Sequence, residues 1–290
     1  MFRAFTQRRR QTTKPFRPWY GILFLVIIAV AFGLKIIDAL KPDKQPISDV
    51  PAISYDDLVS DDGAPELPDE VTHEPEPTMP DPVDEPTEEI PSANPDAHPP
   101  LPLELNLAVP FTSQAPTSNW DAFHEDTCEE ASFLMTVEFY GGRAAGKIDP
   151  TVVEPELTKL VDLETSLGMG FSISLAEAAQ TIDEYYGLKT VILDNPTVDD
   201  IKSLIASGKP VIVPAAGREL GNPNFTGEGP LYHMYVIRGY TESTFITNDP
   251  GTRNGENYVY DIDVVMSSMG DWNSGDPTNG AKRVLYIEPN

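Results

Sequence analysis

The chain has 290 residues, and its 20 Lys and Arg against 46 Asp and Glu give a formal net charge of −26 at pH 7. So large an acidic excess excludes general nucleic-acid binding, which needs a basic surface to neutralise phosphates. The single cysteine, Cys128, excludes an intramolecular disulfide framework and any metal site built from several cysteines. The 29 prolines are too many for a compact fold to take up evenly and indicate a proline-rich tract.

The N-terminal 40 residues predict a membrane anchor. Residues 1–18 form a basic tail without an acidic residue. Residues 19–40 begin with Trp19 and Tyr20 and are mostly apolar, and their length suits a transmembrane helix, which needs about 20 residues. The basic tail predicts a single-pass protein of the cell membrane with its N-terminus in the cytoplasm. The alternative is a signal peptide cleaved after Ala31, and both interpretations place the remaining chain outside the cytoplasm.

Residues 41–100 predict an acidic, Pro-rich, disordered linker. From residue 42 to residue 100 the chain has 14 prolines, 17 Asp and Glu, and one basic residue, Lys44. Such a segment buries too little apolar surface to offset the entropy lost on ordering, and repulsion between its carboxylates extends it further. A plain spacer is the first interpretation, and an acidic tail that binds cations or basic polymers is the second.

Residues 101–290 have the composition of one globular domain of the α+β class. The domain has 28 acidic and 11 basic residues, so it favours neutral or cationic substrates over anionic ones. Apolar periodicity predicts helices at Cys128–Tyr140, Val152–Leu163, Leu175–Tyr186 and Thr197–Ala206. The expected strands are Leu105–Phe111, Lys189–Leu193, Pro210–Ala215, Leu231–Tyr240, Thr244–Asn248 and Arg283–Ile287.

Cys128 is the first candidate for a chemical role. Thr127 and Glu130 have the spacing of a capping box, which places Cys128 in the first turn of a helix. Amide groups and the helix dipole at that end favour a thiolate. The adjacent carboxylates of Glu129 and Glu130 oppose it. A buried structural cysteine beside a satisfied core histidine is the alternative interpretation.

A base for the thiol must come from His124 or His233, the only histidines of the domain. His124 precedes Cys128 by four residues, so its ring could touch the thiol. His233 lies in an apolar strand followed by a second strand, and the two predict a β-hairpin. If Gly239 pairs with Ser243, His233 lies opposite Asp249.

A second register, with Tyr240 paired to Thr244, makes Asp249 the diagonal neighbour of His233 on the same face. In either register the carboxylate can orient the imidazole, as the third member of a nucleophile–base–orienter triad. Gln114, in the loop before the cysteine helix, can offer its side-chain amide as an oxyanion donor beside the Cys128 N–H.

Four segments together resemble a known family: VPFTSQAPTSNW, DTCEEASFLM, GPLYHMYVIRGY and FITNDPG. They look like the C39-like cysteine peptidases of papain-like fold, and the resemblance covers most of Leu105–Ile287. It implies that Cys128 is the nucleophile, His233 the general base, Asp249 the orienting residue and Gln114 the oxyanion donor. It also implies a helix bearing the cysteine, packed on an antiparallel sheet. The chain shows an anchor and a stalk in place of a transporter segment, which puts cleavage of double-glycine leader peptides in doubt.

Three weaker candidates for the substrate cleft are Trp120, His124 and Gly229. Gly229 lies in the glycine-containing loop Gly217–Pro230, which is either a lid over the cleft or an ordinary crossover loop. Asp271 lies in a polar segment that lacks the spacing of a helix–loop–helix calcium site. We expect no metal site and no cofactor.

The sequence therefore predicts a membrane-tethered extracytoplasmic cysteine peptidase or amidase that acts on peptide or protein substrates through a thioester. The alternative is a catalytically inactive C39-like module that binds peptides or cell-wall fragments on a stalk. Cell-wall amidase activity lies between the two. Nothing in the sequence indicates an oligomeric state.

Overall fold

The computed structural model describes residues 46–59 and 101–289. The predicted basic tail and membrane anchor, residues 1–40, lie outside these ranges, as do residues 60–100 of the predicted linker. No helix within the two described ranges is both long and apolar enough to cross a bilayer.

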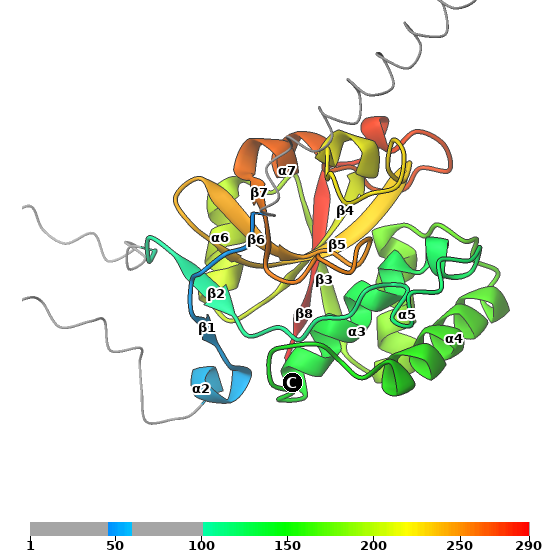
Figure 1. The fold of residues 1–290 in the computed structure, drawn as a ribbon, viewed down its shortest axis with the longest axis horizontal. Coiled ribbons are helices and arrows are strands. Elements are labelled where there is room, and N and C mark those ends of the chain that lie inside the picture. Colours follow the sequence, from blue (N-terminus) through cyan, green and yellow to red (C-terminus); the bar gives the residue numbers. More distant parts are fainter. Residues whose placement is uncertain (1–45, 60–100, 290) are drawn as a thin grey trace, which may run out of the picture. The chain divides into compact units, whose positions relative to one another are not determined.

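The described strands form one eight-stranded sheet, in which every pair but β1–β2 is antiparallel (Figure 1). The order along its main path is β1-β2-β5-β4-β8-β3, and β6 joins β5 to β7. The strands are β1 (Ala52–Ile53), β2 (Leu105–Leu107), β3 (Lys189–Asp194), β4 (Val211–Ala216), β5 (Tyr232–Tyr240), β6 (Thr244–Asn248), β7 (Tyr258–Asp261) and β8 (Arg283–Glu288).

Strand β5 is the centre of the sheet. It pairs with β4, β2 and β6, and all nine of its residues are buried. A β-bulge between Ile237 and Gly239 changes its register with β6. A Cβ at Gly239 would lie 2.5 Å from the Leu105 carbonyl oxygen, so only glycine lets β2 approach this closely. The middle of β5 is therefore held firmly on both edges.

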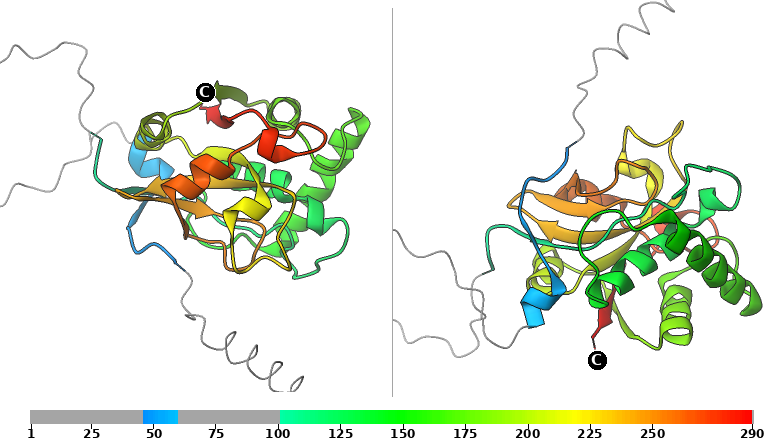
Figure 2. Two further views of the ribbon diagram at one scale, coloured as in Figure 1. Left: turned by 90° about the horizontal axis from the view of Figure 1, so that it is seen from above. Right: turned by 60° about the horizontal axis from the view of Figure 1, so that its bottom comes forward.

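The described helices are α2 (Tyr55–Val59), α3 (Cys128–Tyr140), α4 (Pro150–Ser166), α5 (Leu175–Tyr186), α6 (Val198–Ala206) and α7 (Ile262–Ser268). Short 3₁₀ turns are η1 (His124–Asp126), η2 (Gly217–Leu220) and η3 (Pro277–Asn279). Both views of Figure 2 show α3, α4 and α5, in green, grouped on one side of the strands. The expected α+β class is confirmed, since the helices accompany a mainly antiparallel sheet.

Local capping explains why several helices begin where the sequence predicts. Ser174 and Glu177 form a capping box at the start of α5, and Thr197 and Asp200 form another at α6. Helix α3 also begins at the predicted residue, Cys128, but Thr127 makes no side-chain cap bond. Its hydroxyl instead donates to the Gln114 carbonyl oxygen at 3.1 Å, which ties the loop before α3 to the helix.

Helix α3 is the core helix of the domain. Ten of its residues are buried, and it contacts β5 and β4 as well as α4 and η1. Because α3 is buried on all sides, it can pack against the sheet and against the other helices at the same time. Cys128, its first residue, is thereby placed beside Met234 of β5.

Residues 46–59 correct the predicted boundaries of the linker. They pack on the domain: Ala52 and Ile53 pair with β2, and Tyr55 makes edge-on ring contacts with Phe139 and Tyr140 of α3. Their acidic and Pro-rich composition predicted disorder. Backbone pairing with a free strand edge and a single aromatic anchor order the segment instead.

Candidate active site

The thiol of Cys128 lies at the first residue of α3 and is almost fully buried, with 5% of the residue exposed. It donates a hydrogen bond to Glu129 Oε2 at 2.8 Å. Within the described residues the thiol makes no hydrogen bond to His233. Burial, followed by the charge and hydrogen bond of Glu129, raises the pKa of the Cys128 thiol well above its ordinary value. The resting thiol is thus protonated.

Glu129 is itself buried beside the thiol. Its second oxygen, Oε1, accepts from the Ile173 N–H at 3.3 Å. Burial raises the pKa of Glu129 to about 8, against an ordinary value near 4.5. At neutral pH the neutral acid therefore predominates, and its conversion to a carboxylate above that pH opposes thiolate formation.

His233 and Asp249 form the pair that the hairpin predicted. His233 Nε2 lies 2.7 Å from Asp249 Oδ1, and both side chains are buried. Neither proposed register holds along the whole hairpin. Beside the turn Tyr240 pairs with Phe245, and beyond the bulge Val236 pairs with Asn248. The bulge thus restores, at the His233 end, the register that makes Asp249 a diagonal neighbour.

Asp249 is held from every side. Its Oδ2 accepts from the Tyr260 hydroxyl at 2.5 Å and from Asn222 Nδ2 at 3.1 Å, while Oδ1 accepts from the Gly251 N–H at 2.9 Å. Burial would raise the pKa of Asp249, but its charge interaction and hydrogen bond with His233 and its other donors outweigh burial and lower it. The carboxylate therefore stays ionised beside the imidazole and leaves His233 Nδ1 free for chemistry.

Tyr260 and Asn222 are site residues that the sequence analysis missed. Tyr260 lies on β7, which was not predicted, and Asn222 lies in the loop after η2. No local sequence signal marks either residue. Their role follows only from the pairing of β6 with β7, which brings the β7 tyrosine beside Asp249.

Gln114 lies where the oxyanion prediction places it, on the cleft beside Cys128. Its backbone N–H donates to the Pro250 carbonyl oxygen at 2.9 Å, which ties it to the loop after Asp249. The side-chain Nε2 donates one hydrogen to the His124 carbonyl oxygen at 2.8 Å. The second hydrogen of that amide remains available to an oxyanion.

One cleft of about 340 Å³ unites these groups. It is lined by Cys128, Gln114 and His233, and by the weaker candidates Trp120 and Gly229. Three segments far apart in the sequence thus present a thiol, an amide and an imidazole to the same space.

Residues 221–230 of the predicted lid loop form part of the cleft wall. Phe225 packs edge-on against the His233 ring, with ring centroids 5.2 Å apart. Gly229 has φ +85, a conformation that favours glycine. The loop therefore covers the imidazole in this structure.

His124 does not line this cleft, contrary to the prediction. Its Nδ1 lies 2.8 Å from Asp121 Oδ1 and its Nε2 lies 2.9 Å from Glu154 Oε2, so both ring nitrogens have partners. Burial disfavours the charged ring, but the hydrogen bonds to Glu154 and Asp121 outweigh it and raise the pKa of His124. This histidine links η1 to α4, and only its backbone carbonyl serves the site, through Gln114.

Asp271 has a structural role. Its Oδ1 accepts from the backbone N–H groups of Leu175 and Trp272 at 2.9 Å each. Among the described residues no group of three or more His, Cys, Asp or Glu side chains has an arrangement that could hold a metal ion.

Comparison with known proteins identifies the family of this chain. The chain belongs to the Peptidase_C39 like family, whose family model matches residues 106–275, so the resemblance found in the sequence is confirmed. Among solved structures, that of a C39-like peptidase from Bacillus anthracis is 14% identical with a TM-score of 0.43, over 64% of this chain and 98% of that chain. No curated protein matches the chain at a significant level.

Proposed function

We propose that this chain is a membrane-tethered extracytoplasmic cysteine peptidase or amidase, with Cys128 as nucleophile, His233 as general base and Asp249 as the residue that orients the base. The observation that carries the proposal is the cleft itself. It joins the only thiol of the chain to an imidazole whose far nitrogen is bonded to a buried carboxylate. The tether rests on residues 19–40 of the sequence.

The reaction follows from the free positions of these groups. Cys128 Sγ attacks the carbonyl carbon of the substrate while its proton passes to His233 Nδ1. The Cys128 N–H and the second amide hydrogen of Gln114 stabilise the resulting oxyanion. The C–N bond then breaks as His233 protonates the leaving amine, which leaves a thioester on Cys128. A water that gives its proton to His233 hydrolyses the thioester and restores the thiol.

Glu129 sets the resting state of this cycle. Because the thiol donates to Glu129, it must turn toward His233 before attack. The base therefore removes the proton during attack, and no preformed ion pair is needed. Burial of the thiol disfavours a free thiolate in any case.

A catalytically inactive peptide-binding module is the second candidate, and the same hydrogen bond favours it. If the thiol never leaves Glu129, the cleft binds its ligand without cleaving it. The two candidates differ in whether His233 influences the thiol, which can be measured directly.

The test combines thiol labelling with turnover, using the purified full-length chain. We expect iodoacetamide to alkylate Cys128 with a pH profile that shifts in His233→Ala, and we expect peptide-amide turnover in that variant to fall at least about 10²-fold. His124→Ala is the matched control, because it removes the other histidine of the domain. Each variant is first checked for folding.

Turnover of His124→Ala should stay within several-fold of the wild type. Loss of turnover in His124→Ala with turnover retained in His233→Ala would refute the triad. A thiol with the same pH profile in the wild type and in His233→Ala, together with no cleavage of any peptide, would support the binding module.

A further inference from the structure

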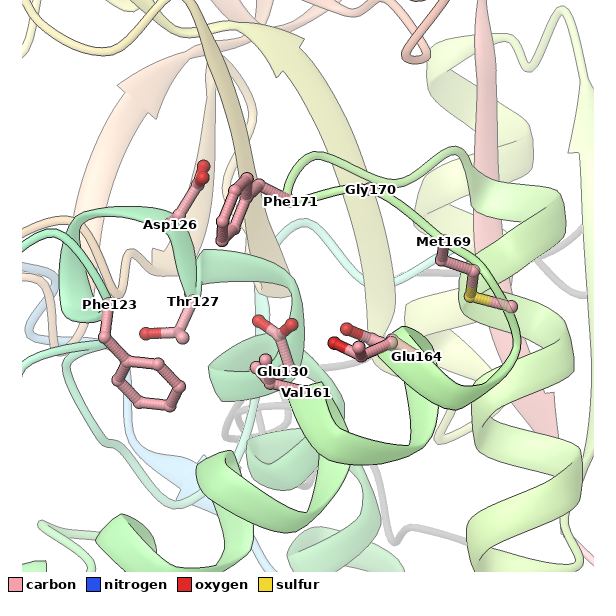
Figure 3. Close-up of a pocket in the computed structure, with 10 residues that line it drawn as sticks. Phe123, Asp126, Thr127, Glu130, Val161, Glu164, Met169, Gly170 and Phe171 are labelled. Carbon is pink, nitrogen blue, oxygen red and sulfur yellow. The ribbon is translucent and has the colours of Figure 1, made fainter.

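A second pocket lies between α3 and α4, on the other side of the η1 turn from the thiol. Its volume is about 230 Å³, and Figure 3 shows Glu130 of α3 and Glu164 of α4 facing each other across it. Glu130 follows Cys128 by two residues, and two residues turn a helix by about 200°. The thiol and the Glu130 carboxyl therefore emerge from nearly opposite sides of the same helix end.

The two carboxyl groups lack partners for half of their oxygens. Glu130 is 1% exposed and Glu164 is 3% exposed, and the two groups hydrogen-bond to each other. Within the part of the chain that the structure describes, Glu130 Oε2 and Glu164 Oε1 accept no hydrogen bond from a protein N–H or hydroxyl group. A buried acceptor without a partner is unfavourable by about 1–3 kcal/mol, because it has lost its hydrogen bonds with water. Two such acceptors side by side therefore favour the binding of a hydrogen-bond donor.

The protonation of the pair points the same way. Burial, followed by the mutual charge repulsion of the neighbouring carboxylates, raises the pKa of Glu130 well above its ordinary value. Burial also raises the pKa of Glu164. Without a cation nearby, the pair keeps a shared proton, and an inserted cation would take the place of that proton.

The remaining walls of the pocket are largely apolar. They include Phe123, Val161, Met169 and Phe171, and the lining is completed by Asp126, Thr127, Thr165 and Gly170. Figure 3 shows the Phe123 and Phe171 rings beside the carboxyl pair, on the Glu130 side. Phe171 is 75% exposed, which is unusual for a side chain of this size. An apolar pocket with carboxyl groups at its end fits a flexible hydrocarbon side chain that carries a cation at its end.

A third hollow shares lining residues with both the pocket and the catalytic cleft. It shares Asp126 with the pocket and Glu125, Pro230 and Tyr232 with the cleft. A helix is about 10 Å across and an extended residue spans about 3.4 Å. A peptide that leaves the cleft through this hollow would thus reach the pocket about three residues from the scissile bond.

We propose that the pocket between α3 and α4 is a subsite that binds a Lys or Arg side chain of the peptide substrate. The proposal rests on the proposed peptidase function and adds the substrate class. The acidic surface of the domain, with 28 acidic against 11 basic residues, attracts the same peptides. A metal ion is a poorer fit, since the described residues place no third ligand beside the pair and the walls are apolar.

The experiment measures kcat/KM of the full-length chain on fluorogenic decapeptides of neutral residues. One Lys is moved through the sequence, and a matched series carries norleucine, which has the same stem without the charge. We expect one position at which Lys exceeds norleucine by at least about 10-fold. Glu164→Gln should reduce that ratio to near one, and Glu130→Gln should do the same.

Asp162→Asn is the matched control. It removes one acidic charge from an exposed position of the same helix, two residues from Glu164, and should leave the ratio unchanged. Melting curves show that each variant is folded. Cleavage with no preference for Lys at any position, or a preference that Glu164→Gln leaves intact, would overturn the subsite.

A separate binding measurement keeps the subsite distinct from the peptidase proposal. Calorimetry with Cys128→Ala compares the affinities of the Lys and norleucine peptides without any cleavage. If no peptide is cleaved by the wild type, the peptidase proposal fails. Tighter binding of the Lys peptide that Glu164→Gln abolishes still supports the subsite, and equal binding of the two peptides overturns it.

Discussion

Substitution of Gly251 tests the His233–Asp249 geometry without removing any of the proposed catalytic groups. Its backbone N–H donates to Asp249 Oδ1, and an alanine keeps this bond. A Cβ there would lie 2.8 Å from His233 Cε1 and 2.8 Å from Phe225 Cε1. Ordinary contact begins near 3.4 Å, so the imidazole or its covering ring must shift by about 0.6 Å. Because a misplacement of about 1 Å costs a rate about 10²-fold, we expect kcat to fall roughly 10-fold or more.

The assay for Gly251→Ala is turnover of the best peptide substrate, with KM and kcat separated. We expect the loss in kcat and a melting temperature close to the wild type, because Gly251 is half-buried and its φ suits alanine. Gly275→Ala is the matched control, since it adds a methyl group in an exposed turn where the nearest atom lies 3.9 Å away. Full turnover in a folded Gly251→Ala chain would show that the position of His233 does not limit the reaction.

Three other predictions concern Glu129 and the segment before the domain. Glu129→Gln should lower the pKa of the Cys128 thiol, because it removes the carboxylate that opposes the thiolate. The measurement is the alkylation rate of the thiol as a function of pH. An unchanged pH profile would show that this prediction is wrong. Since the pKa of Glu129 rises from 4.5 to about 8 on folding, its contribution to stability is present at low pH and is lost as the pH rises through that window. Urea unfolding of Glu129→Gln should therefore vary less with pH than that of the wild type. Tyr55→Ala should lower the free energy of unfolding by about 1–3 kcal/mol, because it removes ring contacts with Phe139 and Tyr140. Unchanged denaturant midpoints would show that residues 46–59 are detached in solution.

Local signals made most helices predictable. The bounds of α3 and α5 agree with the sequence prediction residue for residue, and α6 begins one residue later than predicted because Thr197 is its cap. The capping boxes of α5 and α6 each act within one turn of helix and need no distant partner. The sequence failed where order depends on a distant partner. Residues 46–59 look disordered alone, and β7 is a short strand that pairs with β6 and, through a bridge at Tyr258, with Ile47.

The candidate site likewise combines features that the sequence predicted with features that depend on distant contacts. The sequence alone determined the inventory, because one thiol and two histidines in the domain left few ways to build a nucleophile and a base. It also restricted Asp249 to two hairpin registers. The structure chose between these through a β-bulge between Ile237 and Gly239, which no local signal in the hairpin predicted.

The surroundings of the thiol depended on tertiary structure alone. Glu130 was expected to cap α3, but its side chain turns to Glu164 of α4, and Glu129 turns to the thiol. His124, four residues before Cys128 in the sequence, hydrogen-bonds to Glu154. A residue's type and its place on a helix follow from the chain itself, whereas the partner of a buried polar group is set by which other elements pack against it. Burial strongly favours each such pairing, since an unpaired buried polar group is unfavourable by several kcal/mol.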